Sequence, residues 1–346
     1  MVASRYLDGP EPTANGSSRP NSRALRATRV QGTSTLAASP KLRAIDKSSD
    51  AYSLTYFDPP PGLERYILTL FEIRFHSSSI EGLHPAALGQ LSLTLRGRIK
   101  VDFGEREDDV GGSPILFNAF DVATPYRADG SLWCLGASLS PYGWAALTQA
   151  SRKEYGNRVI PASERLGPAV DRLNTLVSQK RLSDQWSAER ACLEVANWIR
   201  ERLSSIPAEH QAIIDRTLAW LGSSLNPPVE ELFEGSTYSR RQTERLVQQY
   251  FGFPPRGLAR KFRALRAANL LAQPNLTDEG EAEIACAFVD QPHMIREIRR
   301  FCGYTPSRLG GSGDAMFLRL TNMHNLDRFR PYRPIGKGDR TDGPPL

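Results

Sequence analysis

The sequence lacks several features that would indicate whole classes of protein. In its 346 residues no run of 18 apolar residues occurs, so no membrane-spanning helix is predicted. The four cysteines are scattered and form no Cys-x-x-Cys motif, which argues against a disulfide framework or a zinc site and favours a reducing compartment such as the cytoplasm. The net charge of +6 is modest. Binding to a polyanion would therefore depend on local clusters of basic residues.

Motifs of the common enzyme classes are also missing. No Gly-x-Ser-x-Gly elbow, phosphate-binding loop or dinucleotide fingerprint occurs. The five histidines are dispersed without a His-x-His pair, and only His76 and His84, eight residues apart, offer the start of a two-histidine, one-carboxylate metal site. We therefore expect a protein that is not an enzyme and that holds no metal or cofactor, with that site as the remaining alternative.

The two ends of the chain differ in composition from its middle. Residues 1–50 are rich in Ser, Pro, Gly, Ala and Arg, with eight basic and four acidic residues, and are predicted to be a disordered leader. Residues 311–346 are rich in Gly and Pro and include several arginines. They are predicted to form a flexible basic tail.

Residues 51–160 carry the pattern of β-strands. In the stretch LSLTLRGRIKVDF (91–103), apolar residues alternate with polar ones, which indicates a strand with one buried face. Gly97 interrupts the alternation and predicts a bend or bulge. Other short apolar runs are separated by Gly and Pro, which favours an antiparallel barrel or sandwich. Six aromatic residues are candidates either for plain core or for the lining of an apolar pocket: Phe57, Phe71, Phe103, Phe117, Tyr126 and Trp133.

The second half of the chain has helical spacing. Residues 161–206 predict two helices, a linker that could also serve as a dimer hairpin, because apolar residues recur there at intervals of three and four. Residues 207–310 predict a series of short helices. Ser239 and Asp290 are expected to cap two of them, and a long helix is expected over Arg256–Ala272 after Pro254-Pro255.

Charge is distributed unevenly along this helical region. From Tyr238 to Arg266 there are seven Arg and one Lys against one acid, Glu244. The next 24 residues carry five acids and no base, and a second basic run follows in residues 288–309. Each basic run contains a Gly with a Pro two or three residues after it, in Gly252-Phe-Pro-Pro255 and in Gly303-Tyr-Thr-Pro306. Two cationic helices with an acidic support between them are suited to a polyanion.

These residues resemble the AraC/XylS family of bacterial transcription regulators. The signature comprises Ser239 to Arg245, Gly252-Phe-Pro-Pro255, Phe288 with Asp290 to His293, Phe301-Cys-Gly303 and Thr305 to Leu309. A looser similarity to the family's cupin-like sensor domain rests on Gly136 to Pro141 and Asn157-Arg-Val159. The resemblance implies an α+β multidomain protein, with an N-terminal antiparallel β (cupin-like) barrel plus helices at 51–160 and a C-terminal all-α double helix-turn-helix at 207–310.

The chain departs from the family's pattern in both turns. The small residue and the turn glycine of the first unit fall at Phe233 and Thr237, and those of the second unit fall at Glu283 and Ala287. A residue other than glycine in a left-handed turn costs about 1 kcal/mol or more. The second unit is therefore expected either to be distorted or to bind phosphates without reading bases.

The resemblance also implies roles for individual residues. The second helix of each unit would enter the major groove, and the connecting helix would hold the two about 34 Å apart, one turn of DNA. The positions that match base readers are Arg241, Glu244, Arg245, Gln291, His293 and Arg296. The residues expected to bind phosphate are Arg240, Arg256, Arg260, Lys261, Arg299, Arg300 and Arg308. Two alternatives stay open: Glu244 could instead hold a neighbouring arginine, and His293 could serve packing.

The expected function is a cytoplasmic, bacterial, sequence-specific regulator of transcription that responds to a signal. Its expected partners are double-stranded DNA, a small-molecule effector, a second copy of the chain and, for an activator, RNA polymerase. One alternative is a cupin-type small-molecule-binding or enzymatic protein with a degenerate DNA-binding domain. Another is a general nucleic-acid binder acting by charge alone, which would bind all sequences with similar affinity.

Overall fold

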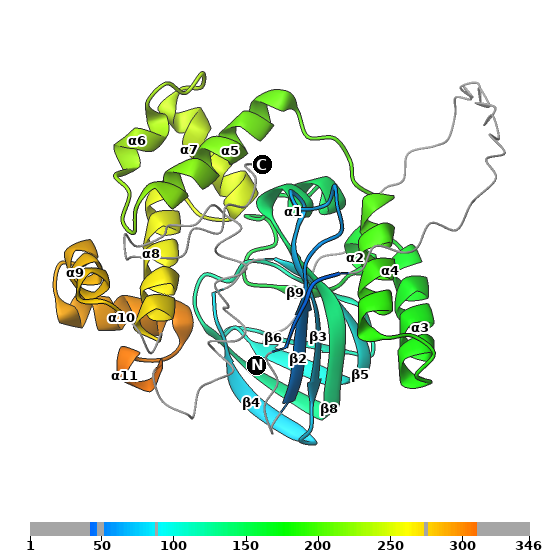
Figure 1. Cartoon of the computed structure of the whole chain (residues 1–346). Helices are drawn as coiled ribbons and strands as arrows, with labels where there is room; N and C mark the ends of the chain where they lie inside the picture. Colours follow the sequence, from blue (N-terminus) through cyan, green and yellow to red (C-terminus); the bar gives the residue numbers. More distant parts are fainter. Residues whose placement is uncertain (1–41, 47–51, 87–88, 273–275, 310–346) are drawn as a thin grey trace, which may run out of the picture. The chain divides into compact units, whose positions relative to one another are not determined.

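A computed structural model describes residues 42–46, 52–86, 89–272 and 276–309 (Figure 1). The predicted tail at 311–346 and most of the predicted leader lie outside these ranges. The strands are β1 (Ala44–Asp46), β2 (Tyr52–Phe57), β3 (Ile67–Phe75), β4 (Ser79–His84), β5 (Gln90–Asp102), β6 (Glu107–Gly111), β7 (Ile115–Phe117), β8 (Thr124–Leu139) and β9 (Val159–Pro161).

All the strand pairs in this sheet are antiparallel. The order is β1-β2-β3-β8-β5-β7-β9, with β4 added to β8 and β6 added to β5. The long strand β8 pairs along its length with β3, β4 and β5, and thereby joins the parts of the sheet. An apolar cluster that includes Leu54, Ile73 and Phe117 fills the inner side.

The predicted irregularity at Gly97 is confirmed. Gly97 has φ +84°, and the register between β5 and β8 shifts around it, between Thr94 and Arg98. A Cβ at this position would lie 2.7 Å from the backbone oxygen of Asp129. The bend therefore needs glycine for both its conformation and its space.

The ordered β structure begins earlier than the sequence predicts. Strand β1 lies within the predicted leader and pairs with β2, and Leu42 is buried beside it. The Leu42 amide donates to Oε1 of Glu189 at 2.6 Å. This strand is too short for its alternation to show in the sequence.

Eleven helices lie in the described residues: α1 (Pro141–Thr148), α2 (Ser163–Leu166), α3 (Ala169–Leu182), α4 (Ala188–Arg200), α5 (Ala208–Ser223), α6 (Val229–Phe233), α7 (Arg240–Phe251), α8 (Pro255–Leu271), α9 (Asp278–Ala287), α10 (Gln291–Cys302) and α11 (Pro306–Leu309). Helices α3 and α4 lie within residues 161–206, where the sequence predicts two helices, and the short α2 precedes them. The α3–α4 pair packs on the outer side of the sheet through an apolar cluster that includes Leu93, Leu173 and Val195.

Helices α5–α11 form the C-terminal region around an apolar cluster that also includes Leu68, Ala86 and Tyr142 of the N-terminal half. Helix α8 is central in this region and buried over most of its length. Two units of short helix, turn and longer helix, α6–α7 and α9–α10, lie on either side of α8 in the chain. The predicted fold class is thereby confirmed: antiparallel β structure with helices comes first, and an all-α double helix-turn-helix follows.

The turn between α9 and α10 does not carry the conformational cost that the sequence predicts for a missing glycine. Helix α9 continues through Ala287, and the chain leaves it at Phe288 with φ −120° and ψ 155°, an extended conformation open to any residue. In the first unit, the left-handed position is taken by Gly235 at φ +63°, two residues before Thr237. Both turns therefore form without a non-glycine residue in the left-handed region, and the predicted distortion of the second unit is not found.

Candidate nucleic-acid interface

Both longer helices of the two units begin and end in the same way. The Ser239 hydroxyl accepts from the Gln242 amide at 3.3 Å, and the Asp290 carboxylate accepts from the His293 amide at 2.6 Å. Each of these is a side-chain N-cap. At the other ends, Gly252 and Gly303 take left-handed conformations and close α7 and α10. Residues 239–252 and 290–303 are thus two matched helices, as the caps in the sequence predict.

Helix α7 presents a basic outer face. Arg241 and Arg245 are exposed and have no ion-pair partner among the described residues, while Leu246 and Val247 are buried on the inner side. Glu244 lies 3.4 Å from Nε of Arg240. The structure thus has Glu244 beside an arginine, one of the two arrangements that the sequence left open. Arg241 and Arg245 are the side chains of this helix best placed to meet a ligand.

On α10, the exposed side chains are Gln291, Arg296, Arg299 and Arg300. The ring of His293 lies between the start of its own helix and Glu297, whose carboxylate is 3.8 Å from its Nε2. Its Nδ1 lies 3.4 Å from the Val289 amide, and its ring meets the Phe288 ring at 5.8 Å between centroids. This geometry gives His293 a packing role, which was the alternative to reading a base.

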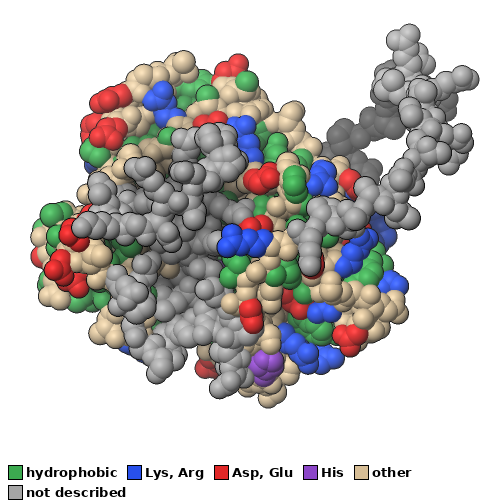
Figure 2. All heavy atoms as spheres, in the orientation of Figure 1, with side chains coloured by type: hydrophobic (Ala, Val, Ile, Leu, Met, Phe, Trp, Pro, Cys, Tyr) green, Lys and Arg blue, Asp and Glu red, His purple; other side chains and the backbone are tan. Residues whose placement is uncertain are grey.

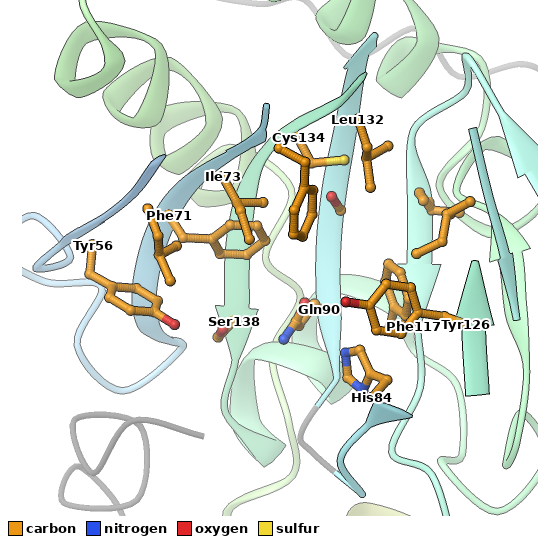
Figure 3. Close-up of a pocket in the computed structure, with 15 residues that line it drawn as sticks. Tyr56, Phe71, Ile73, His84, Gln90, Phe117, Tyr126, Leu132, Cys134 and Ser138 are labelled. Carbon is orange, nitrogen blue, oxygen red and sulfur yellow. The ribbon is translucent and has the colours of Figure 1, made fainter. Parts of the chain in front are cut away.

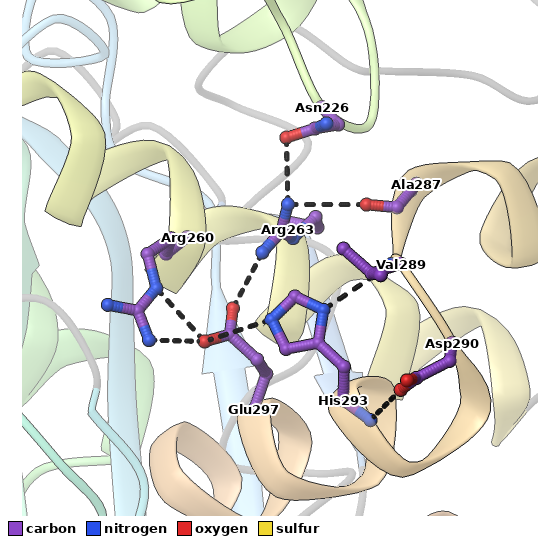
Figure 4. A network of polar contacts seen from close by, with 8 residues as sticks. All are labelled: Asn226, Arg260, Arg263, Ala287, Val289, Asp290, His293 and Glu297. Atoms are coloured by element: carbon purple, nitrogen blue, oxygen red, sulfur yellow. Dashed lines mark hydrogen bonds and ion pairs between the residues drawn. The ribbon is translucent and has the colours of Figure 1, made fainter.

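A polar network fixes α10 on the connecting helix α8 (Figure 4). The carboxylate of Glu297, 3% exposed, accepts from Arg260 at 2.5 Å and from Arg263 at 2.8 Å. Arg263 also donates to Oδ1 of Asn226 and to the Ala287 carbonyl. Burial alone would raise the pKa of Glu297, but the hydrogen bonds from the two arginines outweigh it and lower that pKa. Sequence reasoning missed this network, because none of its long-range pairs leaves a local pattern.

Three residues predicted to bind phosphate have other partners in this structure: Arg240, which lies beside Glu244, and two residues of α8. Arg260 is half-exposed and paired with Glu297. Lys261 is 2% exposed, and its Nζ donates to the Phe120 carbonyl of the β domain at 3.3 Å. Burial, reinforced by the nearby Arg152, lowers the pKa of Lys261 to about 7. In this arrangement Lys261 does not reach the surface, whereas Arg240, Arg256, Arg299, Arg300 and Arg308 are exposed.

Acidic side chains lie on α6 and α9, the short helices that precede α7 and α10 and are called the supporting helices below. Glu230 and Glu231 are in the first turn of α6, and Asp278, Glu279 and Glu281 are in the first turn of α9, where they face the positive end of the helix dipole. Figure 2 shows acidic groups gathered over both of these helices. An anion approaching this region is therefore favoured at α7 and α10 and disfavoured at α6 and α9.

The β domain contacts the end of the second unit through the main chain. The Ala86 amide donates to the Phe301 carbonyl and the Ala123 amide donates to the Arg300 carbonyl, both at 2.8 Å. The last carbonyls of a helix have no partner within it. Two of the carbonyls at the end of α10 thus find their donors in the β domain.

A cavity of about 80 Å³ lies inside the folded sheet (Figure 3). Among the aromatic residues that the sequence nominates, Phe71, Phe117 and Tyr126 line it. Phe57 and Trp133 belong to the cluster on the other side of the sheet. Phe103 packs at the edge of the inner cluster without lining the cavity. In the described part of the chain, no group of three or more His, Cys, Asp or Glu residues is placed to hold a metal ion.

His84 lines this cavity and predicts a pH dependence of stability. Its ring stacks on Phe117 at 5.5 Å, and its Nδ1 lies 2.8 Å from the Pro85 carbonyl. Burial lowers the pKa of His84 to about 4, against the opposing effect of that hydrogen bond. The unfolded chain takes up this proton near pH 6.5. The stabilisation is therefore complete above pH 6.5 and is lost as the pH falls toward 4.

Between pH 7 and pH 4 the free energy of unfolding should fall both in the wild type and in His84→Gln. We expect this fall to be up to about 3 kcal/mol smaller in His84→Gln than in the wild type. Urea denaturation of both proteins at the two pH values measures this difference. His76→Gln is the control, because His76 is exposed. An equal fall in the wild type and in His84→Gln would show that folding does not lower the pKa of His84.

Comparison with known proteins agrees with this geometry. A family model described as a helix-turn-helix domain matches residues 234–310. The HTH-type transcriptional regulator GbdR of Pseudomonas aeruginosa is 32% identical over 108 residues, which are 29% of this chain and 29% of that protein. The match thus covers less than a third of either chain. No helix among the described residues is long and apolar enough to cross a membrane.

Solved structures of two regulators are distantly similar. ToxT from Vibrio cholerae has a TM-score of 0.41 at 9% identity, over 69% of this chain and 96% of that one. The AraC-like transcriptional activator CuxR has a TM-score of 0.27 at 12% identity, over 65% of this chain and 85% of that one. The sequence match and the two capped helices converge on the same segment. The C-terminal region of this chain, residues 234–310, is a helix-turn-helix domain.

Proposed function

We propose that this protein is a sequence-specific DNA-binding regulator of transcription that reads two adjacent major-groove segments with α7 and α10. The observation that carries the proposal is the pair of matched, capped helices, each with exposed basic side chains and each preceded by an acidic supporting helix. Arg241, Arg245 and Arg296 are the proposed readers of guanine, since arginine pairs with its O6 and N7 atoms. Gln291 is suited to adenine for the same geometric reason.

The remaining residues expected to contact DNA have supporting roles in this proposal. Glu244 orients Arg240, and His293 packs the start of α10, so neither is required to touch a base. Five exposed arginines are proposed to bind phosphates: Arg240, Arg256, Arg299, Arg300 and Arg308. Phosphate contacts would set the position of the protein, while the base contacts would specify the sequence.

We also propose that the β domain senses a signal, namely a small molecule held in its cavity. The support is the cavity itself and the main-chain contacts that join this domain to the end of α10. The α3–α4 hairpin is the proposed surface for a second copy of the chain, because Leu176 and Leu182 of α3 are exposed. A cytoplasmic location and, for an activator, contact with RNA polymerase complete the proposal.

Selection of random-sequence duplex DNA by the full chain at near-physiological salt tests the central proposal. We expect a motif of two blocks about ten base pairs apart, one for each reading helix. A single block would restrict base reading to one unit. No enrichment, with binding that weakens with salt equally on all sequences, would contradict sequence-specific regulation.

We expect Arg245→Ala to weaken binding to the selected site by about 1–3 kcal/mol and to relax the preference at one base. Arg172→Ala is the matched control, since it removes the same charge from an exposed position on α3, away from the reading helices. The change in the dissociation constant is measured on the selected site and on a scrambled duplex. An equal loss on both duplexes would make Arg245 a phosphate contact.

A further inference from the structure

The walls of the β-domain cavity are mostly apolar, with a polar patch at one end. Gln90 of β5 lies opposite Ser138 of β8 and opposite Phe117 of β7 in the ladder, and the ring of His84 stacks on Phe117. In Figure 3, Ser138, Gln90 and His84 lie toward one end, while Ile73 and Leu132 lie toward the other. A molecule in this cavity would thus meet hydrogen-bonding groups on one side and mainly apolar side chains, with the Cys134 thiol among them, on the other.

No Lys, Arg, Asp or Glu is among the described residues that line this cavity. The titratable groups that do line it are neutral at pH 7. Burial lowers the pKa of His84 to about 4 and raises that of Cys134 to about 11. Burial also raises the pKa of Tyr126. The whole lining is therefore without formal charge at the pH of a cytoplasm.

The lysine that influences His84 electrostatically does not alter this conclusion. Lys261 lies outside the lining, and its Nζ donates to the Phe120 carbonyl. A charged ligand would have to leave water for a lining that offers no opposite charge. Moving an ion from water into such surroundings costs several kcal/mol even after the protein relaxes. A neutral hydrogen-bonding group carries a much smaller cost, which Ser138 or Gln90 can offset.

We propose that the cavity binds a small uncharged molecule, largely apolar, with one hydrogen-bonding group directed at Ser138, Gln90 and His84. This inference rests on the proposed signal-sensing function and names the chemical class of its ligand. At about 80 Å³ the cavity is smaller than the roughly 150 Å³ that holds benzene in an apolar site. A ligand with one aromatic ring, such as the probes below, therefore fits only when lining side chains move outward as it binds.

Three probes of nearly equal shape test the charge requirement on the wild-type chain: benzamide, benzoate and protonated benzamidine. Ligand-observed NMR titration gives a dissociation constant for each. We expect benzamide to bind and the two ions to bind at least about tenfold more weakly. Binding of either ion as tight as that of benzamide would overturn the proposal, and so would a failure of all three probes to bind.

A charge placed in the lining tests the location. Gln90→Lys is expected to reverse the preference so that benzoate binds more tightly than benzamide, whereas Gln90→Met, of similar length and without charge, keeps the neutral preference. An unchanged preference in folded Gln90→Lys would overturn the assignment to this cavity. Should Gln90→Lys fail to fold, Leu132→Trp fills the same cavity without adding charge. Its expected effect is loss of benzamide binding, and retained binding would also overturn the assignment.

The outcome is separable from that of the proposed function. The same preparation of the full chain is used for the selection of duplex DNA without any probe. A two-block motif together with no charge preference refutes the ligand class alone. A clear preference for benzamide together with no DNA motif refutes the regulatory function and leaves the ligand class standing.

Discussion

Replacing Glu297 by Ala is expected to lower the free energy of unfolding of the full chain by about 3–5 kcal/mol, because it leaves a buried cation without its counter-charge. The side chain of Arg263 is 10% exposed, and its guanidinium donates to Oε2 of Glu297 at 2.8 Å. Arg260 loses its carboxylate as well. Asn226 and the Ala287 carbonyl remain as partners of Arg263, but neither carries a charge.

The matched control is Glu244→Ala. Glu244 is also a carboxylate, on α7, and is paired with an arginine, but its side chain is 45% exposed. An exposed pair of this kind contributes about 0.3–0.5 kcal/mol. Urea denaturation of both variants measures the difference. Equal and small losses would mean that water replaces the carboxylate around Arg263, and that the network does not stabilise the fold.

Acid should have the same effect on the wild type as the substitution. The pKa of Glu297 is lowered in the folded chain, so its contribution to stability is present above the pKa of the unfolded state, about 4.3. The contribution is lost as the pH falls through the lower folded value. Glu297→Ala has no such carboxylate, so acid does not lower its free energy of unfolding in this way. The difference in unfolding free energy between wild type and Glu297→Ala should therefore shrink below about pH 4.

Replacing Gly136 by Ala is expected to destabilise the β domain by about 3 kcal/mol or more, because the added methyl group would overlap the main chain of the next strand. A Cβ at Gly136 would lie 2.1 Å from the Leu91 carbonyl oxygen and 2.9 Å from Cα of Ser92. Both atoms belong to β5, the strand that pairs with β8 at this point. Main-chain atoms cannot rotate away as a side chain can, so the strands would have to separate.

Gly156→Ala is the control for this substitution. A Cβ at Gly156 would meet its nearest atoms at 3.6 and 3.8 Å, which is ordinary contact. Chemical denaturation followed by far-UV circular dichroism compares the two variants with the wild type. A loss below about 1 kcal/mol in Gly136→Ala would show that β5 and β8 can shift apart at little cost, which would contradict the close approach described here.

Local patterns predicted local structure well. The bend at Gly97 and the caps at Ser239 and Asp290 depend on residues near one another in the chain, and the structure confirms them. The single buried face predicted for 91–103 is wrong in its first half, because Ser92 and Thr94 are buried there as well as the leucines. Leu91, Leu93 and Leu95 pack in the cluster outside the sheet, whereas Ile99 and Val101, beyond the bend, pack in the inner cluster. The turn of the second unit was misjudged for a similar reason. Its cost was predicted from a missing glycine, whereas the chain leaves α9 through an extended Phe288.

Contacts between distant segments were beyond the sequence. The local sequence does not show what a basic residue of α8 contacts. Lys261 was predicted to face DNA, but in the structure it donates to a carbonyl of the β domain. In the sequence Glu297 is an acidic residue within a basic helix. Only the packing of α8 against α10 places two arginines beside it. The three nominated aromatic residues that line the cavity could not be told from those outside it, because facing the inside of a sheet depends on how the sheet folds.

The hydrogen bonds from Ala86 and Ala123 to the end of α10 involve only main-chain atoms. Nineteen of the twenty amino acids carry the same amide donor, and proline alone lacks it. Relatives of this chain could therefore exchange the residues at both positions and keep these bonds. Correlated substitutions between the two regions would then be weak, and alanine scanning would pass over both positions. This contact between the β domain and α10 would leave little trace in evolution, however strongly the fold depends on it.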